Sequence, residues 1–237
     1  MSKILSKEEW LRRQRLKNKI MVILVITLMI AIFTVSALVI GKLLISLFNN
    51  TGHKTEAVTV TLSNGTVVSK QYLTPNRYSR PQTKLKKVNG IVIHYTANPG
   101  TSASANRNYF EGLARKKTTS ASSHYIIGLE GEIIQCIPLT EIAYASNERN
   151  KDTISIECCH PDETGRFNEE TYKSLVALAA VLYKEFNLGE EDIIRHYDVS
   201  GKLCPLYYVE NETEWEKLKK DIMDEIIKMN EDKQNNI

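Results

Sequence analysis

Cysteine and histidine are both scarce in this chain of 237 residues, which contains four cysteines and five histidines. So few cysteines, two of them adjacent, do not make the disulfide framework of a small secreted domain. The sequence also lacks a glycine-rich phosphate loop and a GxSxG elbow, so nothing favours a nucleotide, a flavin or a serine nucleophile. The net charge of +3 is small and by itself argues neither for nor against nucleic acid. No nucleic-acid partner is predicted.

Charged residues are absent from residues 20–41, and about 20 apolar residues suffice for a helix to cross a membrane. We therefore predict a transmembrane anchor at 20–41. Only Lys42 follows it closely, whereas many basic residues precede it, so the positive-inside rule predicts a cytoplasmic basic tail at 1–19 and an extracytoplasmic remainder. A cleavable signal peptide is the alternative, but its apolar region is usually only about 7–15 residues long. The basic residues of the tail are Lys3, Lys7, Arg12, Arg13, Arg15, Lys17 and Lys19.

The polar segment 42–76 predicts an extracytoplasmic spacer. Within it, the pattern AVTVTLSNGTVVS predicts a small hairpin, with Asn64-Gly65 in a tight two-residue turn. Prolines and basic residues in TPNRYSRPQTKLKK then predict an extended approach to a domain that covers 77–230. Residues 231–237 are expected to form a C-terminal tail.

Short strand and helix patterns alternate from residue 88 onward. They predict an α/β domain in which a mixed central β-sheet is flanked by helices, preceded by the one transmembrane helix. The strands are expected at 90–95, 124–129, 132–138 and 152–159. The helices are expected at 102–116, 168–188 and 212–229, and the last two carry their apolar residues on one face.

A histidine and a cysteine, His196 and Cys204, stand close together in the segment RHYDVSGKLCP. Their spacing is not that of a structural zinc site, and a catalytic zinc needs three protein ligands and one open position. His94 is the candidate third ligand because it ends the strand pattern IVIH, and sites in α/β sheets gather at the carboxyl ends of strands. Zn²⁺ held there would make hydroxide available at neutral pH. The alternative is a core histidine, a buried apolar cysteine and a surface histidine.

Two further residues could act beside such a metal. Lys202 lies two residues before Cys204, so the same loop would bring a cation able to hold an oxyanion. Glu157 ends the strand pattern TISIE, where a carboxylate is unusual unless it is paired or functional. Near zinc it could take a proton from water and deliver it to a leaving amine. An exposed lysine and a salt-bridged strand-end glutamate are the alternatives.

Four blocks, taken together, resemble the zinc-dependent N-acetylmuramoyl-L-alanine amidases of the type-2 amidase family, which also includes the peptidoglycan recognition proteins. The blocks are GIVIHYTANPG, SSHYIIGLEGEIIQCIP, NKDTISIECC and IIRHYDVSGKLCP, in collinear order. The resemblance implies zinc bound by His94, His196 and Cys204, with Glu157 as the catalytic glutamate and Lys202 as the lysine before the last ligand. Recognition proteins that only bind cell wall typically lack the cysteine, so its presence favours catalysis.

The chain departs from the family at several positions. Ser123 stands where phage-type amidases have a tyrosine, so the catalytic role falls on Glu157. Tyr144-Ala145 stands where many relatives carry Trp-His. Asn98, His124 and Tyr144 are predicted to contact the substrate, although His124 could equally be a packed strand residue. The other cysteines are expected to be structural, with Cys158 and Cys159 on opposite faces of one strand.

The resemblance implies a hydrolase, an autolysin, that cleaves the amide bond between N-acetylmuramic acid and L-alanine in bacterial peptidoglycan. The anchor would place it in the bacterial cell membrane as a single-pass protein, with the N-terminus cytoplasmic and the catalytic domain extracytoplasmic. Two alternatives remain open: a non-catalytic peptidoglycan-binding module, and a zinc peptidase that acts on the stem peptide.

Overall fold

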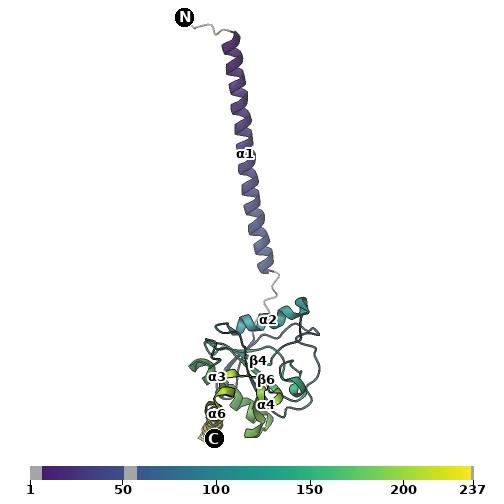
Figure 1. Ribbon diagram of the computed structural model, residues 1–237, viewed down its shortest axis with the longest axis vertical. Helices are drawn as coiled ribbons and strands as arrows, with labels where there is room; N and C mark the ends of the chain where they lie inside the picture. Colours follow the sequence, from purple (N-terminus) through teal and green to yellow (C-terminus); the bar gives the residue numbers. More distant parts are fainter. Residues whose placement is uncertain (1–6, 51–57, 236–237) are drawn as a thin grey trace. The chain divides into compact units, whose positions relative to one another are not determined.

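The computed structural model describes residues 7–50 and 58–235, and the chain divides into two units between Lys54 and Thr55 (Figure 1). The first unit is the helix α1 (Lys7–Asn50). Its segment Arg15–Lys42 has a mean hydropathy of 2.9 and is long and apolar enough to cross a membrane. A signal sequence near an N-terminus has the same properties, so the anchor at 20–41 stays a prediction. Residues 1–6 of the predicted tail and 51–57 of the predicted spacer lie outside the described residues.

The second unit is built on one mixed sheet with the strand order β1-β2-β5-β4-β6-β3-β7. The strands β4, β6, β3 and β7 run parallel, β5 is antiparallel to β4 and parallel to β2, and β1 closes an antiparallel hairpin with β2. The predicted α/β class with a mixed central sheet is confirmed. The bounds are β1 (Val58–Thr61), β2 (Val67–Lys70), β3 (Ile91–Tyr95), β4 (Tyr125–Ile127), β5 (Ile133–Gln135), β6 (Ile154–Cys158) and β7 (Ile193–Arg195).

Residues 58–76 belong to the folded domain and not to a spacer. β2 pairs with β5 in parallel, with Val68 opposite Ile133. Val68 and Leu73 are completely buried, and the Leu73 N–H donates to the Cys136 carbonyl at 2.8 Å. The boundary predicted near residue 77 is therefore too late. The local sequence predicts the turn of this short hairpin. It does not show that β5, a strand far along the chain, pairs with β2 and so includes the hairpin in the sheet.

Helices cover both faces of this sheet. The long ones are α2 (Ala103–Lys116), α3 (Glu169–Phe186) and α6 (Glu212–Asn235), and the short ones are α4 (His196–Ser200), α5 (Leu206–Glu210) and the 3₁₀ turns η1 (Asn147–Lys151) and η2 (Glu190–Asp192). The three predicted helices are confirmed, although α6 continues through most of the predicted C-terminal tail. The N-cap Asn168 accepts a hydrogen bond from the Thr171 N–H and so fixes the start of α3.

The core divides into two layers, one on each face of the sheet. Alternate strand residues such as Ile93 and Ile156 pack with residues of α3 and α6 in one layer. Ile126 and Ile134 pack with residues of α2 in the other. Cys158 belongs to the first layer and Cys159 to the second, which confirms that they face opposite ways, and all four cysteines are free. Because side chains alternate along a strand, His94 and Glu157 lie on the face opposite to Ile93 and Ile156.

Candidate functional site

The site lies at the carboxyl end of the three adjacent parallel strands β6, β3 and β7. His94 of β3 stands opposite Glu157 of β6 in the parallel register. On the other side of β3, β7 ends at Arg195, immediately before His196. Parallel strands bring their carboxyl ends to the same edge of a sheet, so residues far apart in sequence meet here.

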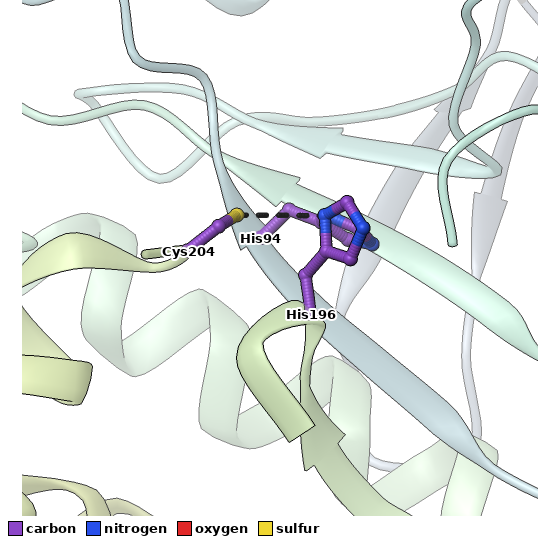
Figure 2. Close-up of side chains that lie close together, drawn as sticks. All are labelled: His94, His196 and Cys204. Atoms are coloured by element: carbon purple, nitrogen blue, oxygen red, sulfur yellow. Dashed lines mark hydrogen bonds between the residues drawn. The ribbon is translucent and has the colours of Figure 1, made fainter. Parts of the chain in front are cut away.

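His94, His196 and Cys204 surround a common point (Figure 2), and one ligand atom from each lies within 4.8 Å of the others. The Cys204 Sγ is 3.7 Å from the His94 Nδ1, and the two imidazole centroids are 4.6 Å apart. Tetrahedral zinc with ordinary Zn–S and Zn–N bonds would hold these two atoms about 3.6 Å apart. The alternative of a surface histidine is wrong, because His196 is only 5% exposed.

The unsatisfied polar atoms of the site favour a bound cation. The His196 Nδ1 is buried and has no hydrogen-bond partner among the described residues. A buried nitrogen without a partner is costly unless a ligand occupies its lone pair. Burial, with smaller effects from the nearby His196 and Lys202, holds the pKa of His94 well below its ordinary value, and burial also lowers the pKa of His196. Both rings are therefore neutral at pH 7, which is the state that binds metal.

The thiol of Cys204 completes a set of donors that suits zinc. Burial raises the pKa of the Cys204 thiol to about 12, the charge of Glu157 adds to the rise, and the Tyr95 N–H and Lys202 oppose it. Such a thiol becomes a ligand by giving up its proton to a bound cation. Two neutral imidazoles and one thiolate are ligands found in catalytic zinc sites that keep an open position.

Glu157 combines burial with an unpaired oxygen. Its Oε2 is buried without a hydrogen-bond partner among the described residues. Burial raises the pKa of Glu157 to about 8, and the Lys202 ammonium partly counteracts this rise. A carboxyl group with a pKa near neutrality can both accept and donate a proton. Lys202 itself is exposed, and its positive charge lies close enough to affect the pKa of Glu157 and of His94.

The loop that carries His196 and Cys204 is closed by backbone hydrogen bonds. The Tyr197 N–H donates to the Cys204 carbonyl at 2.9 Å, which brings the two ends of the loop together. α4 ends at Ser200 and is capped by Gly201, whose φ of 74° favours glycine. This closure explains how one short segment supplies two side chains to a single point.

Arg195 anchors the start of the same loop through its buried side chain. Its guanidinium is almost fully buried and pairs with Asp198 at 2.9 Å and with Glu212 at 2.6 Å. It also donates to the Tyr208 carbonyl at 2.9 Å. Arg195 therefore ties the start of the loop to the helices that follow it, and so restricts the position of both His196 and Cys204.

The residues predicted to contact substrate fall into two groups. His124 is 1% exposed, its Nδ1 accepts from the Ser155 N–H at 3.0 Å, and its Nε2 donates to the Glu141 carbonyl at 2.9 Å. With both ring nitrogens occupied, His124 is a packed residue immediately before β4, and its predicted contact with substrate is not supported. Asn98 is exposed in the loop after β3 and Tyr144 is half-buried before η1, so their predicted contacts with substrate stay predictions.

The sequence patterns give no indication of two neighbours of the proposed ligands. The Ser146 Oγ lies 3.1 Å from the His94 Nε2, and the Asn147 Oδ1 lies 2.8 Å from the His196 Nε2. The only local signal was the departure at Tyr144-Ala145, immediately before them. Neither residue belongs to a ligand motif, so the fold was needed to find them.

Known proteins resemble the chain in the region of the site. A family model described as N-acetylmuramoyl-L-alanine amidase matches residues 84–206, a range that contains every proposed ligand. The N-acetylmuramoyl-L-alanine amidase CwlL of Bacillus licheniformis is 35% identical over 161 residues, which is 62% of this chain and 44% of the relative. The amidase BlyA of Bacillus subtilis (strain 168) is 32% identical over 166 residues, which is 61% of this chain and 44% of the relative. The chain thus spans less than half the length of each.

Solved structures share the fold. The catalytic domain of XlyA aligns with a TM-score of 0.55 at 24% identity, and the alignment covers 65% of this chain and 98% of that domain. The PlyG catalytic domain aligns with a TM-score of 0.57 at 23% identity, covering 68% of this chain and 95% of that domain. The sheet and its helices are therefore a known arrangement, whereas α1 lies outside the range that the family model matches.

Proposed function

Because the chain belongs to the N-acetylmuramoyl-L-alanine amidase family, we propose that it is a zinc-dependent hydrolase of bacterial peptidoglycan. It would cleave the amide bond between N-acetylmuramic acid and L-alanine and so separate the stem peptide from the glycan. The observation that carries this proposal is the buried group of His94, His196 and Cys204, in which the His196 Nδ1 lacks a partner among the described residues.

The residues of the chain fit the chemistry of amide hydrolysis. Zinc at this site would supply Lewis acidity, which polarises a carbonyl and makes water nucleophilic at neutral pH. Glu157 takes a proton from the attacking water at its Oε2 and returns it to the nitrogen of L-alanine as the C–N bond breaks. Lys202 places a positive charge where the carbonyl oxygen becomes negative.

We also propose that α1 anchors the enzyme in the bacterial cell membrane. Apolar side chains along it, such as Leu24 and Phe33, are more than half exposed, and a continuous apolar surface of this kind calls for lipid or a partner. The basic residues that precede its charge-free segment 20–41 favour a cytoplasmic N-terminus and an extracytoplasmic hydrolase. A tethered enzyme reaches only the wall near the membrane, so lengthening the segment before β1 should extend the region of wall that is cleaved in cells.

End-group analysis of digested peptidoglycan tests the reaction. The proposal predicts new L-alanine amino termini together with new lactyl carboxyl groups on muramic acid. New termini deeper in the stem peptide would instead show a zinc peptidase. Muropeptide binding with no new termini would show a binding module. Either result would contradict the amidase assignment.

A further inference from the structure

One short segment, Ser146-Asn147, contacts the Nε2 atoms of both proposed histidine ligands. The His94 Nε2 lies 3.1 Å from the Ser146 Oγ, and the His196 Nε2 lies 2.8 Å from the Asn147 Oδ1. The other ring nitrogens are left for a ligand: the His94 Nδ1 lies 3.7 Å from the Cys204 Sγ, and the His196 Nδ1 is buried with no protein partner among the described residues.

The Asn147 contact determines which nitrogen of His196 carries the proton. An amide oxygen only accepts hydrogen bonds, so the Asn147 Oδ1 requires a proton on the His196 Nε2. A neutral imidazole has a single N–H, and the His196 Nδ1 is then left with a free lone pair. The Ser146 hydroxyl can accept from the His94 Nε2 in the same way. His196 therefore presents an unprotonated Nδ1 before any cation arrives, and the Ser146 contact is compatible with the same tautomer in His94.

Hydrogen bonds hold the backbone of this segment in a turn, although Asn147 itself is exposed. The Asn150 Oδ1 accepts from the backbone N–H of Ala145 at 2.9 Å and of Ser146 at 2.6 Å, which closes a turn ahead of η1. Ser146 is 1% exposed. Asn147 has a φ of 52°, the left-handed region that asparagine tolerates better than most residues. In this conformation the Asn147 amide oxygen reaches the His196 Nε2.

We propose that Ser146 and Asn147 are positioning residues of the metal centre, which hold His94 and His196 in the tautomer and orientation that bind the cation. The inference rests on the proposed zinc site and adds the segment that orients its two histidines before metal binds. Tyr144-Ala145 leads directly into this segment, so the place where the chain departs from many relatives adjoins the support of both histidines.

The expected effect is on metal affinity. Loss of a hydrogen-bond partner behind a ligating histidine typically costs 10- to 100-fold in affinity. Asn147→Ala and Asn147→Gly should each weaken zinc binding by that factor. The glycine variant accepts the positive φ without strain, so it separates loss of the amide from loss of backbone geometry. Asn147→Asp keeps an accepting oxygen and should restore the affinity, while Ser146→Ala should weaken binding through His94.

The experiment uses the full chain in detergent. Zinc affinity is measured by chelator competition, and the absorption spectrum of the Co²⁺-substituted protein reports the geometry of the ligands. Asn108→Ala and Ser104→Ala, both exposed on α2, are matched controls that should bind zinc like the wild type. Unfolding of the metal-free protein is followed in parallel, and the Asn147 variants should unfold like the wild type.

The outcomes separate the two proposals. Weaker zinc binding and an altered Co²⁺ spectrum in Asn147→Gly, with recovery in Asn147→Asp, would support the positioning role. Unchanged affinity in Asn147→Gly and Ser146→Ala would overturn it while leaving the zinc site intact. A loss that matches destabilisation of the metal-free form would also overturn it, since the role would then be structural. A wild-type chain that binds no zinc would refute the zinc site itself.

Discussion

Glu157 stands directly opposite His94 in the parallel pairing of β6 with β3, so the proposed proton carrier and a proposed ligand share one face of the sheet. Neighbouring strands lie about 4.8 Å apart. This relationship is built into the backbone, and it does not depend on the conformation of a flexible loop. It explains why a single edge of the sheet can support both metal binding and proton transfer.

Substitution of Glu157 should separate catalysis from metal binding. Glu157→Gln keeps the size of the side chain but removes its ability to carry a proton, so amide cleavage should fall by about 10²–10⁴-fold. Zinc content should stay at the wild-type level, since Glu157 is not among the three clustered ligands. The rate of release of L-alanine amino termini, with metal analysis of the same sample, checks this. Near wild-type activity would exclude Glu157 as the proton carrier.

Zinc affinity should depend strongly on pH through Cys204. The pKa of its thiol is raised to about 12 by burial, so the metal-free site holds a protonated thiol at pH 7. Binding then releases one proton, and the affinity should rise about tenfold for each pH unit between pH 6 and 8. Chelator competition at several pH values measures the slope. An affinity independent of pH would show that Cys204 does not bind as a thiolate.

The buried His124 should make the fold sensitive to acid. Burial lowers the pKa of His124 to about 4, from an ordinary value of 6.5. The unfolded chain therefore binds a proton at a pH where the folded chain does not, and stability falls as the pH drops from 6.5 towards 4. The expected loss is about 3 kcal/mol. Urea unfolding at pH 7 and pH 4.5 should show a smaller difference for His124→Gln, and an identical difference would contradict this account.

The hairpin β1–β2 should be required for a stable domain. Removing residues before 77 would delete the strand that pairs with β5 and expose the face that Val68 and Leu73 cover. A fragment that begins at residue 77 should therefore unfold at a lower temperature, or aggregate, compared with one that begins at residue 55. Calorimetry of the two fragments measures the difference. Equal melting temperatures would restore the interpretation of this segment as a spacer.

Much of the fold could be predicted from local patterns. The buried strands around Ile93 and Ile156 and the amphipathic face of α3 follow from hydrophobic periodicity, which depends only on neighbouring residues. The place of β1–β2 in the sheet depends on a pairing between distant segments. Local alternation carries no information about that pairing, and so the sequence pattern alone predicts a spacer here.

The site shows the same division. His94 and Glu157 were predictable because each ends a strand pattern, and His196 and Cys204 because they share one short segment. The packed role of His124 depends on the Glu141 carbonyl across the fold. Ser146 and Asn147 contact the Nε2 atoms of His94 and His196. These contacts join distant segments of the chain, so only the three-dimensional structure reveals them.

The most direct test of the central claim compares the wild-type chain with Cys204→Ala for zinc content and for amino termini released from purified peptidoglycan. The account predicts one zinc per wild-type chain and release of L-alanine amino groups, with both lost in the variant because one of three ligands is gone. A wild-type chain that frees these amino groups without zinc, or a Cys204→Ala variant that keeps both properties, would contradict it.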